Sequence, residues 1–156
     1  MNLERLLDDL VKQGKLKEQK TRPDYLEGLL DAANDNFVAA QKIFESGFFV
    51  VAFKAVYDGI LQIARVVLLL NGYVPDDGEQ HKTTFFVASM FLGDDFHSLI
   101  KRIDLYRVKR NQCVYQPLIL VSKQESSDII NLAGEFWGKV KDYLKEKDPR
   151  LQLFDF

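Results

Sequence analysis

The chain has 156 residues, 47% of them hydrophobic and 12% aromatic, so it is long and apolar enough to form one domain with a real core. Its formal net charge of −2 excludes a strong general attraction to polyanions, and any binding of nucleic acid must come from a local patch. A single cysteine and two histidines exclude an intramolecular disulfide and argue against a Cys/His zinc site, so we predict no metal.

The first expected helix covers about residues 2–13 and ends near Gly14. A charged linker, "KLKEQKTR", follows. Thr21 is the expected N-cap of the next helix, because Pro23 then falls in the first turn, where its missing N–H costs nothing. We expect this second helix to run to about Ser46, where Gly47 interrupts it.

The third expected helix, about residues 48–71, is apolar on nearly every side, which is typical of a central, buried helix. Its few polar residues fall on one stripe: Lys54, Asp58, Gln62 and Arg65. This stripe is either the solvent edge of the helix or a polar face toward another helix. In the second case Asp58 or Gln62 would pair with Arg107 or Arg110.

After a loop, "YVPDDGEQ", further helices are expected at about 81–92, from near Asp94 to before Pro117, and at about 123–147. No strand-like alternation of any length is visible. The sequence therefore predicts an all-α protein, an antiparallel four- or five-helix up-and-down bundle with an extra N-terminal helix. We divide it into an N-terminal amphipathic helix and linker (1–20), the bundle (21–147) and an apolar tail (148–156).

The C-terminal tail is unusually apolar. Exposure of the tail's apolar side chains would be costly, so they dock on the chain's own core, across a dimer or on a partner: Leu151, Leu153, Phe154 and Phe156.

The apolar runs "FFVVAF" and "VVLLL" are far shorter than the ~20 residues that span a bilayer. The N-terminus lacks the apolar core of a secretory signal. We therefore expect a soluble, cytoplasmic protein with no membrane segment.

The stretch "YRVKRNQCVYQP", residues 106–117, contains the strongest functional signal. Phe96, Leu99, Ile103 and Tyr106 form an ordinary apolar stripe, and the next position on it is Arg110. A guanidinium cannot be buried unpaired without a cost of several kcal/mol, so either the stripe reaches solvent there or Arg110 lines a polar groove. Five basic residues against one acid give residues 101–110 a local charge of +4, which suits a phosphate backbone. The alternative without a binding role is a solvated helix face, in which Arg107 pairs with Asp104.

The apolar helix ending "ARVVLLLNGY", the polar loop with His81, and the pair Arg110–Asn111 before a proline together resemble the HEPN superfamily over roughly residues 23–145. The resemblance implies a small helical bundle that dimerises. It also implies metal-independent ribonuclease activity without an organic cofactor. Members of this family are often encoded beside a nucleotidyltransferase-like antitoxin, which would then be a partner protein. The family's ribonuclease motif is commonly Arg-Asn-x-x-x-His, and Tyr115 stands here in the place of the histidine. Since a tyrosine with a pKa near 10 is a poor base at neutral pH, we expect weakened or absent catalysis.

Three functions follow, in order of preference. The first is a catalytically weak or inactive HEPN-like homodimer that binds nucleotide or RNA, possibly in a toxin–antitoxin-type system. Its binding residues would be Arg107, Lys109, Arg110 and Asn111, with Asp58 and Gln62 in support. The second is a protein–protein interaction module with no nucleic-acid role. The third is a metal-independent ribonuclease with Arg110, Tyr115 and His81 as candidate catalytic residues, which requires His81 to face Arg110 rather than to cap or pack the fourth helix.

Overall fold

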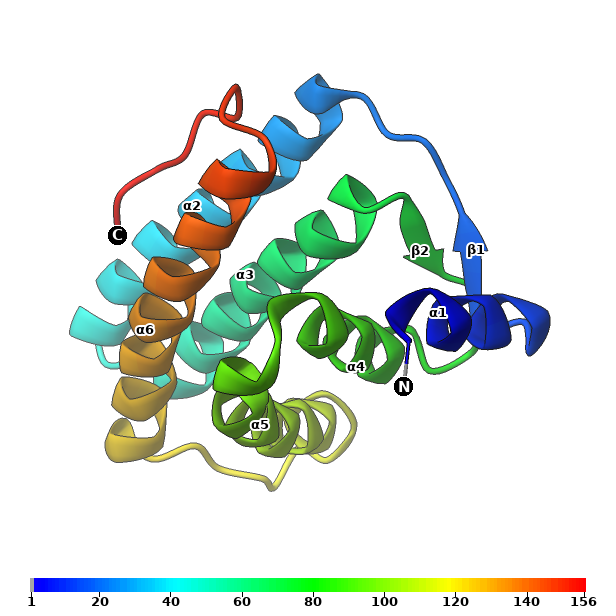
Figure 1. The fold of residues 1–156 in the computed structure, drawn as a ribbon. Helices are drawn as coiled ribbons and strands as arrows, with labels where there is room; N and C mark the ends of the chain where they lie inside the picture. The colour runs from blue at the N-terminus through cyan, green and yellow to red at the C-terminus, as the bar shows by residue number, and fades with distance from the viewer. Residues whose placement is uncertain (1) are drawn as a thin grey trace.

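The computed structural model describes residues 2–156, and within this range it confirms the predicted all-α helical bundle (Figure 1). The helices and strands, in chain order, are α1 (Leu3–Lys12), β1 (Leu16–Glu18), α2 (Pro23–Glu45), α3 (Phe49–Leu70), β2 (Tyr73–Pro75), α4 (Gln80–Leu92), the 3₁₀ helix η1 (Asp94–Phe96), α5 (His97–Tyr115) and α6 (Lys123–Lys147). None of the helices between residues 2 and 156 has both the length and the apolar character needed to cross a membrane.

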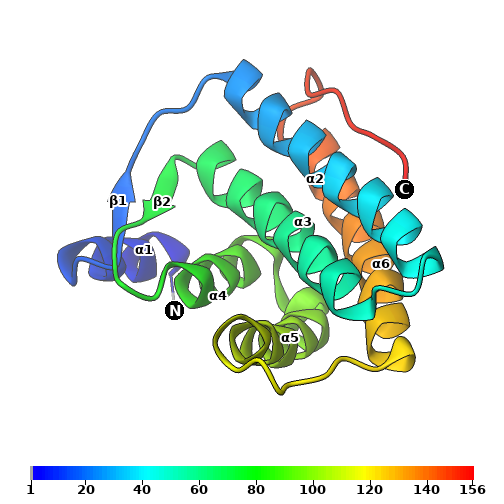
Figure 2. The ribbon, with the colours of Figure 1, turned by 180° about the vertical axis from the view of Figure 1, so that it is seen from behind.

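Helix α3 lies at the centre of the molecule. It contacts α2 and α6 on one side and α4 and α5 on the other, and both views show it between these two groups (Figures 1 and 2). Helices α2 and α3 run antiparallel, joined by a tight turn at Gly47, whereas α4 and α5 form a second antiparallel pair that crosses α3. The nearly continuous apolar sequence of α3 is explained by this position, because most of its side chains are buried.

Capping residues and prolines determine where the helices begin, and one predicted N-cap is wrong. Ser122 caps α6 in a reciprocal capping box with Glu125. The predicted cap Thr21 is wrong: Arg22 is the N-cap of α2, and the Thr21 hydroxyl has no hydrogen-bond partner in residues 2–156. The reason is Pro23, which occupies the first helical position and forces the residue before it into an extended conformation.

A short antiparallel ladder is the second correction, since no strands were expected. The pairs are Leu16 with Pro75, Lys17 with Val74 and Glu18 with Tyr73. Three residues are too few to show a two-residue alternation, so this ladder has no sequence signal. It places what was predicted as a charged linker beside the loop that leads into α4, and it buries Leu16 in the main core.

The C-terminal tail docks on the chain's own α2 and α6, the first of the three predicted possibilities. The ring of Phe154 stacks on Trp137 of α6 with centroids 4.1 Å apart, and the indole N–H of Trp137 donates to the Phe154 carbonyl at 3.0 Å. Phe156 packs on Phe37 of α2 at 4.7 Å. The aromatic side chains of the tail therefore extend the core over one face of the bundle.

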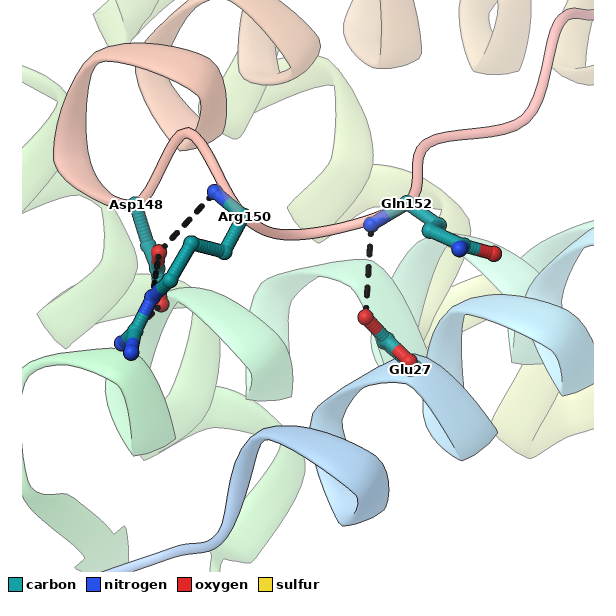
Figure 3. Close-up of polar contacts among 4 residues, drawn as sticks. All are labelled: Glu27, Asp148, Arg150 and Gln152. Carbon is teal, nitrogen blue, oxygen red and sulfur yellow. Dashed lines mark hydrogen bonds and ion pairs between the residues drawn. The ribbon is translucent and has the colours of Figure 1, made fainter.

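Polar contacts fix the start of the tail (Figure 3). The Asp148 carboxylate accepts hydrogen bonds from the backbone N–H and the guanidinium of Arg150, at 3.1 and 3.0 Å. Further along, the backbone N–H of Gln152 donates to the Glu27 carboxylate of α2 at 3.4 Å. The tail thus crosses from the end of α6 to α2 along a defined path.

The crossing of α2 and α3 depends on Gly59. A Cβ at this position would lie 2.5 Å from Cε1 of Phe37, which is fully buried and packed against the tail. We expect Gly59→Ala to lower the free energy of unfolding by roughly 1–3 kcal/mol through overpacking. Gly28→Ala is the matched control, because Gly28 of α2 has open space around it, and helix propensity should make this variant more stable by up to about 1 kcal/mol. Urea unfolding of the three proteins measures both changes, and equal stability of Gly59→Ala and wild type would contradict this account of the crossing.

Candidate functional site

The predicted apolar stripe of α5 is confirmed, and it ends at Arg110. Phe96, Leu99 and Ile103 are buried, and Tyr106 is half-buried against Phe53 of α3. The side chain of Arg110 is 24% exposed, so the stripe does not simply run out into solvent. Arg110 instead lies at the edge of the core with one side toward α3 and the other toward an open cleft.

Two neighbouring residues of α3 hold the Arg110 guanidinium. The carboxylate of Asp58 lies 3.7 Å from an Arg110 terminal nitrogen, and the guanidinium carbon lies 5.7 Å from the ring centroid of Tyr57. The ring face attracts the cation, while the carboxylate is too distant for a good hydrogen bond. The Nε atom of Arg110 is buried and has no acceptor within residues 2–156. Arg110 is therefore positioned and charge-compensated, but most of its five N–H donors lack a protein acceptor.

The open side of Arg110 faces a cleft of about 510 Å³, which we call the arginine cleft. Two segments form it, the loop and first turn of α4 on one wall and the C-terminal half of α5 on the other. The lining residues are Asp77, Gly78, Glu79, Gln80, His81, Lys82, Arg107, Arg110, Asn111 and Tyr115.

His81 lines the arginine cleft, as the third function required, and does not cap α4, whose N-cap is Glu79. Its Nδ1 atom lies 3.1 Å from the Tyr57 hydroxyl. Burial, followed by the positive charges of Arg110 and Arg65, lowers the pKa of His81 below its ordinary 6.5. The imidazole is therefore neutral at pH 7. Burial also raises the pKa of Tyr57, so its hydroxyl keeps its proton and can either donate to His81 or accept from it.

The remaining predicted residues on α5 divide into two groups. Arg107 and Asn111 line the arginine cleft, and Tyr115 lies at its rim with 79% of its surface exposed. Arg107 also makes the expected pair with Asp104, at 2.8 Å. Lys109 does not line the cleft, because it lies 3.3 Å from Glu125 of α6.

Of the two supporting residues on α3, the structure brings only Asp58 to Arg110. Gln62 accepts a hydrogen bond from the Asn36 side chain of α2 at 2.9 Å, and it is not part of the cleft. The polar stripe of α3 therefore follows neither alternative completely, because Asp58 faces Arg110 of α5 whereas Gln62 faces Asn36 of α2.

The sequence did not identify Tyr57, the loop residues 77–79, or His81's neighbours Gln80 and Lys82 as parts of the site. Tyr57 is fully buried, and its ring and hydroxyl contact Arg110 and His81. A buried tyrosine hydroxyl needs a partner, and this was the available signal. Asp77 is the first residue of the loop that lines the cleft, and its carboxylate accepts hydrogen bonds from the Glu79 backbone N–H and the Thr83 hydroxyl. The sequence "DDGEQHKT" allows this turn but does not specify it.

No group of three or more His, Cys, Asp or Glu side chains within residues 2–156 is arranged to hold a metal ion. No protein-family model matches the chain, and a comparison with curated proteins gives no match either.

The lowered pKa of His81 predicts a pH-dependent stability. As the pH falls below 6.5, the unfolded chain takes up the His81 proton before the folded chain does, so the stabilisation is complete above 6.5 and decreases toward the folded-state pKa. We expect the free energy of unfolding to fall more between pH 7.5 and 5.5 in wild type than in His81→Gln. Urea unfolding at the two pH values measures this. The carboxylates are the same in both proteins, so their contribution to the pH dependence cancels in the comparison. If the free energy of unfolding changes equally with pH in both proteins, the lowered pKa of His81 is wrong.

Proposed function

We propose that this protein is a HEPN-like protein that binds a nucleotide or a short stretch of RNA by holding a phosphate group on Arg110. The observation that carries the proposal is the incomplete set of partners of this guanidinium on the wall of a 510 Å³ cleft. A planar fork of N–H donors matches the geometry of phosphate oxygens, and a phosphate would supply the acceptors that the chain does not.

The composition of the arginine cleft supports a small or short ligand. Arg107, Lys82 and the Asn111 amide line the same cleft and can add charge and hydrogen bonds to a phosphate. Asp77 and Glu79 on the opposite wall limit the positive charge. A cleft of mixed charge suits one or a few phosphates better than a long polyanion, whose binding requires many cationic contacts.

The resemblance to the HEPN superfamily gives independent support, because Arg110 and Asn111 occupy the positions of that family's Arg-Asn motif. The exposed Tyr115, which stands in the place of the family's histidine, is a poor general base but can stack on a base or donate a hydrogen bond. We therefore propose binding with weak or no cleavage.

A second candidate is a metal-independent ribonuclease, and the position of His81 favours it. If His81 donates its Nδ1 proton to the Tyr57 hydroxyl, its Nε2 atom is free to accept the proton of an attacking RNA 2′-hydroxyl. The opposite tautomer, with Nδ1 accepting from Tyr57, leaves an Nε2–H group that donates to a phosphate oxygen instead.

The predicted homodimer stays a prediction. Val114, Leu118 and Leu120, which are close to Tyr115 in the sequence, are exposed, and Leu118 reaches 90% exposure. A second copy or a partner protein that covered this surface would remove apolar area from water. The molar mass in solution, measured by light scattering, tests the dimer, and a monomer at all concentrations would contradict it.

Arg110→Ala should weaken binding of inorganic pyrophosphate and of short labelled RNA at least about tenfold, since charged hydrogen bonds contribute about 1.5–3 kcal/mol each. Arg102→Ala is the matched control, because Arg102 lies on the same helix and within the same basic window but pairs with Glu135 outside the cleft. Titration over a salt series measures affinity, and product analysis of the RNA samples measures cleavage.

Equal affinity of Arg110→Ala and Arg102→Ala for both probes would contradict the proposed function. Cleavage by wild type that disappears in His81→Gln, while binding persists, would favour the ribonuclease over the binding protein.

A further inference from the structure

A second pocket adjoins the arginine cleft. It has a volume of about 240 Å³, and Gln80 lines both cavities. The other residues around it come from the start of α2, the C-terminal half of α3 and the β-ladder: Gln19, Tyr25, Leu29, Arg65, Leu68, Leu69, Tyr73, Val74 and Pro75. Together the two cavities fall in the range of about 300–1,000 Å³ that is typical of small-ligand sites.

The pocket combines an apolar floor with a few polar groups. Leu68 and Leu69 of α3 form part of the floor, and the aromatic rings of Tyr25 and Tyr73 lie in its walls. Arg65 provides a guanidinium, and it makes no ion pair and no side-chain hydrogen bond with any of residues 2–156. Flat aromatic surfaces beside a few converging donors are the features that bind a planar heterocycle.

Helix α3 connects the two cavities, because its Asp58 pairs with Arg110 of the arginine cleft and its Arg65 lines the pocket. Asp58, which holds Arg110, and Arg65 are seven residues apart on α3, which is two turns or about 10 Å along the axis on nearly the same face. His81 is close enough to both arginines that both charges lower its pKa. One nucleotide spans about this distance between its phosphate and the far edge of its base.

We propose that this pocket binds the nucleobase of the ligand whose phosphate lies on Arg110, and that it favours guanine. This inference rests on the proposed function. The Arg65 guanidinium can donate two parallel hydrogen bonds to the O6 and N7 acceptors of guanine, a pairing that cytosine does not offer. The side-chain amides of Gln19 and Gln80 both donate and accept, so they can complete the contacts to the base edge. Tyr25, which is 56% exposed, is free to stack on the ring.

The experiment compares GMP, CMP and inorganic pyrophosphate as probes by calorimetric titration. The variants are Tyr25→Ala, which removes a stacking ring without changing charge, and Arg65→Lys, which keeps the charge but removes the planar fork. Since Tyr25 is exposed and Arg65→Lys is conservative, both should fold, and thermal unfolding checks this.

We expect wild type to bind GMP more tightly than CMP or pyrophosphate. Each variant should lose about tenfold in affinity for GMP with pyrophosphate binding unchanged, whereas Arg110→Ala should weaken both probes. If wild type binds pyrophosphate as tightly as GMP, or if neither pocket variant changes GMP affinity, the nucleobase pocket is wrong and the phosphate site on Arg110 stands. If no phosphate-bearing probe binds wild type, the proposed function and the pocket both fail.

Discussion

Helix α3 is buried on nearly all sides. Because α2 and α6 cover one side and α4 and α5 cover the other, the few polar side chains of α3 must either reach an edge or find partners. Gln62 bonds to Asn36, and Asp58 and Tyr57 hold Arg110. Arg65 lines a pocket and has no ion-pair partner among residues 2–156. The arginine cleft and the adjoining pocket are thus consequences of how a mostly apolar helix accommodates its polar positions.

The electrostatics of the arginine cleft follow from the same packing. Arg110 lies at the edge of the core, where Asp58 and the Tyr57 ring compensate its charge without satisfying all its donors. Its charge, together with burial, keeps His81 neutral. If a phosphate binds Arg110 as we propose, it would supply acceptors to the guanidinium and favour protonation of His81, so that anion binding and proton uptake would be coupled.

Much of the fold could be predicted from the sequence, because helical periodicity extends over many residues and averages out local exceptions. The central position of α3 and the core stripe of α5 were both predicted, and the position of Arg110 at the end of that stripe raised the question of the site. The β-ladder could not be predicted, since three-residue strands carry no period. Lys109 and Gln62 were predicted to belong to the site but contact Glu125 and Asn36 instead, because sequence spacing fixes a helix face but not which neighbouring helix it meets.

In the proposed function, the Arg110 guanidinium is the group that would receive a phosphate. Its side-chain N–H signals can be followed by ¹⁵N NMR while inorganic pyrophosphate is added, with Arg102 as an internal reference outside the cleft. We expect the Arg110 signals to shift and become protected from exchange with solvent, because new acceptors cover these donors, while the Arg102 signals stay in place. If the Arg110 signals do not change at pyrophosphate concentrations that saturate the protein, the phosphate does not lie on Arg110.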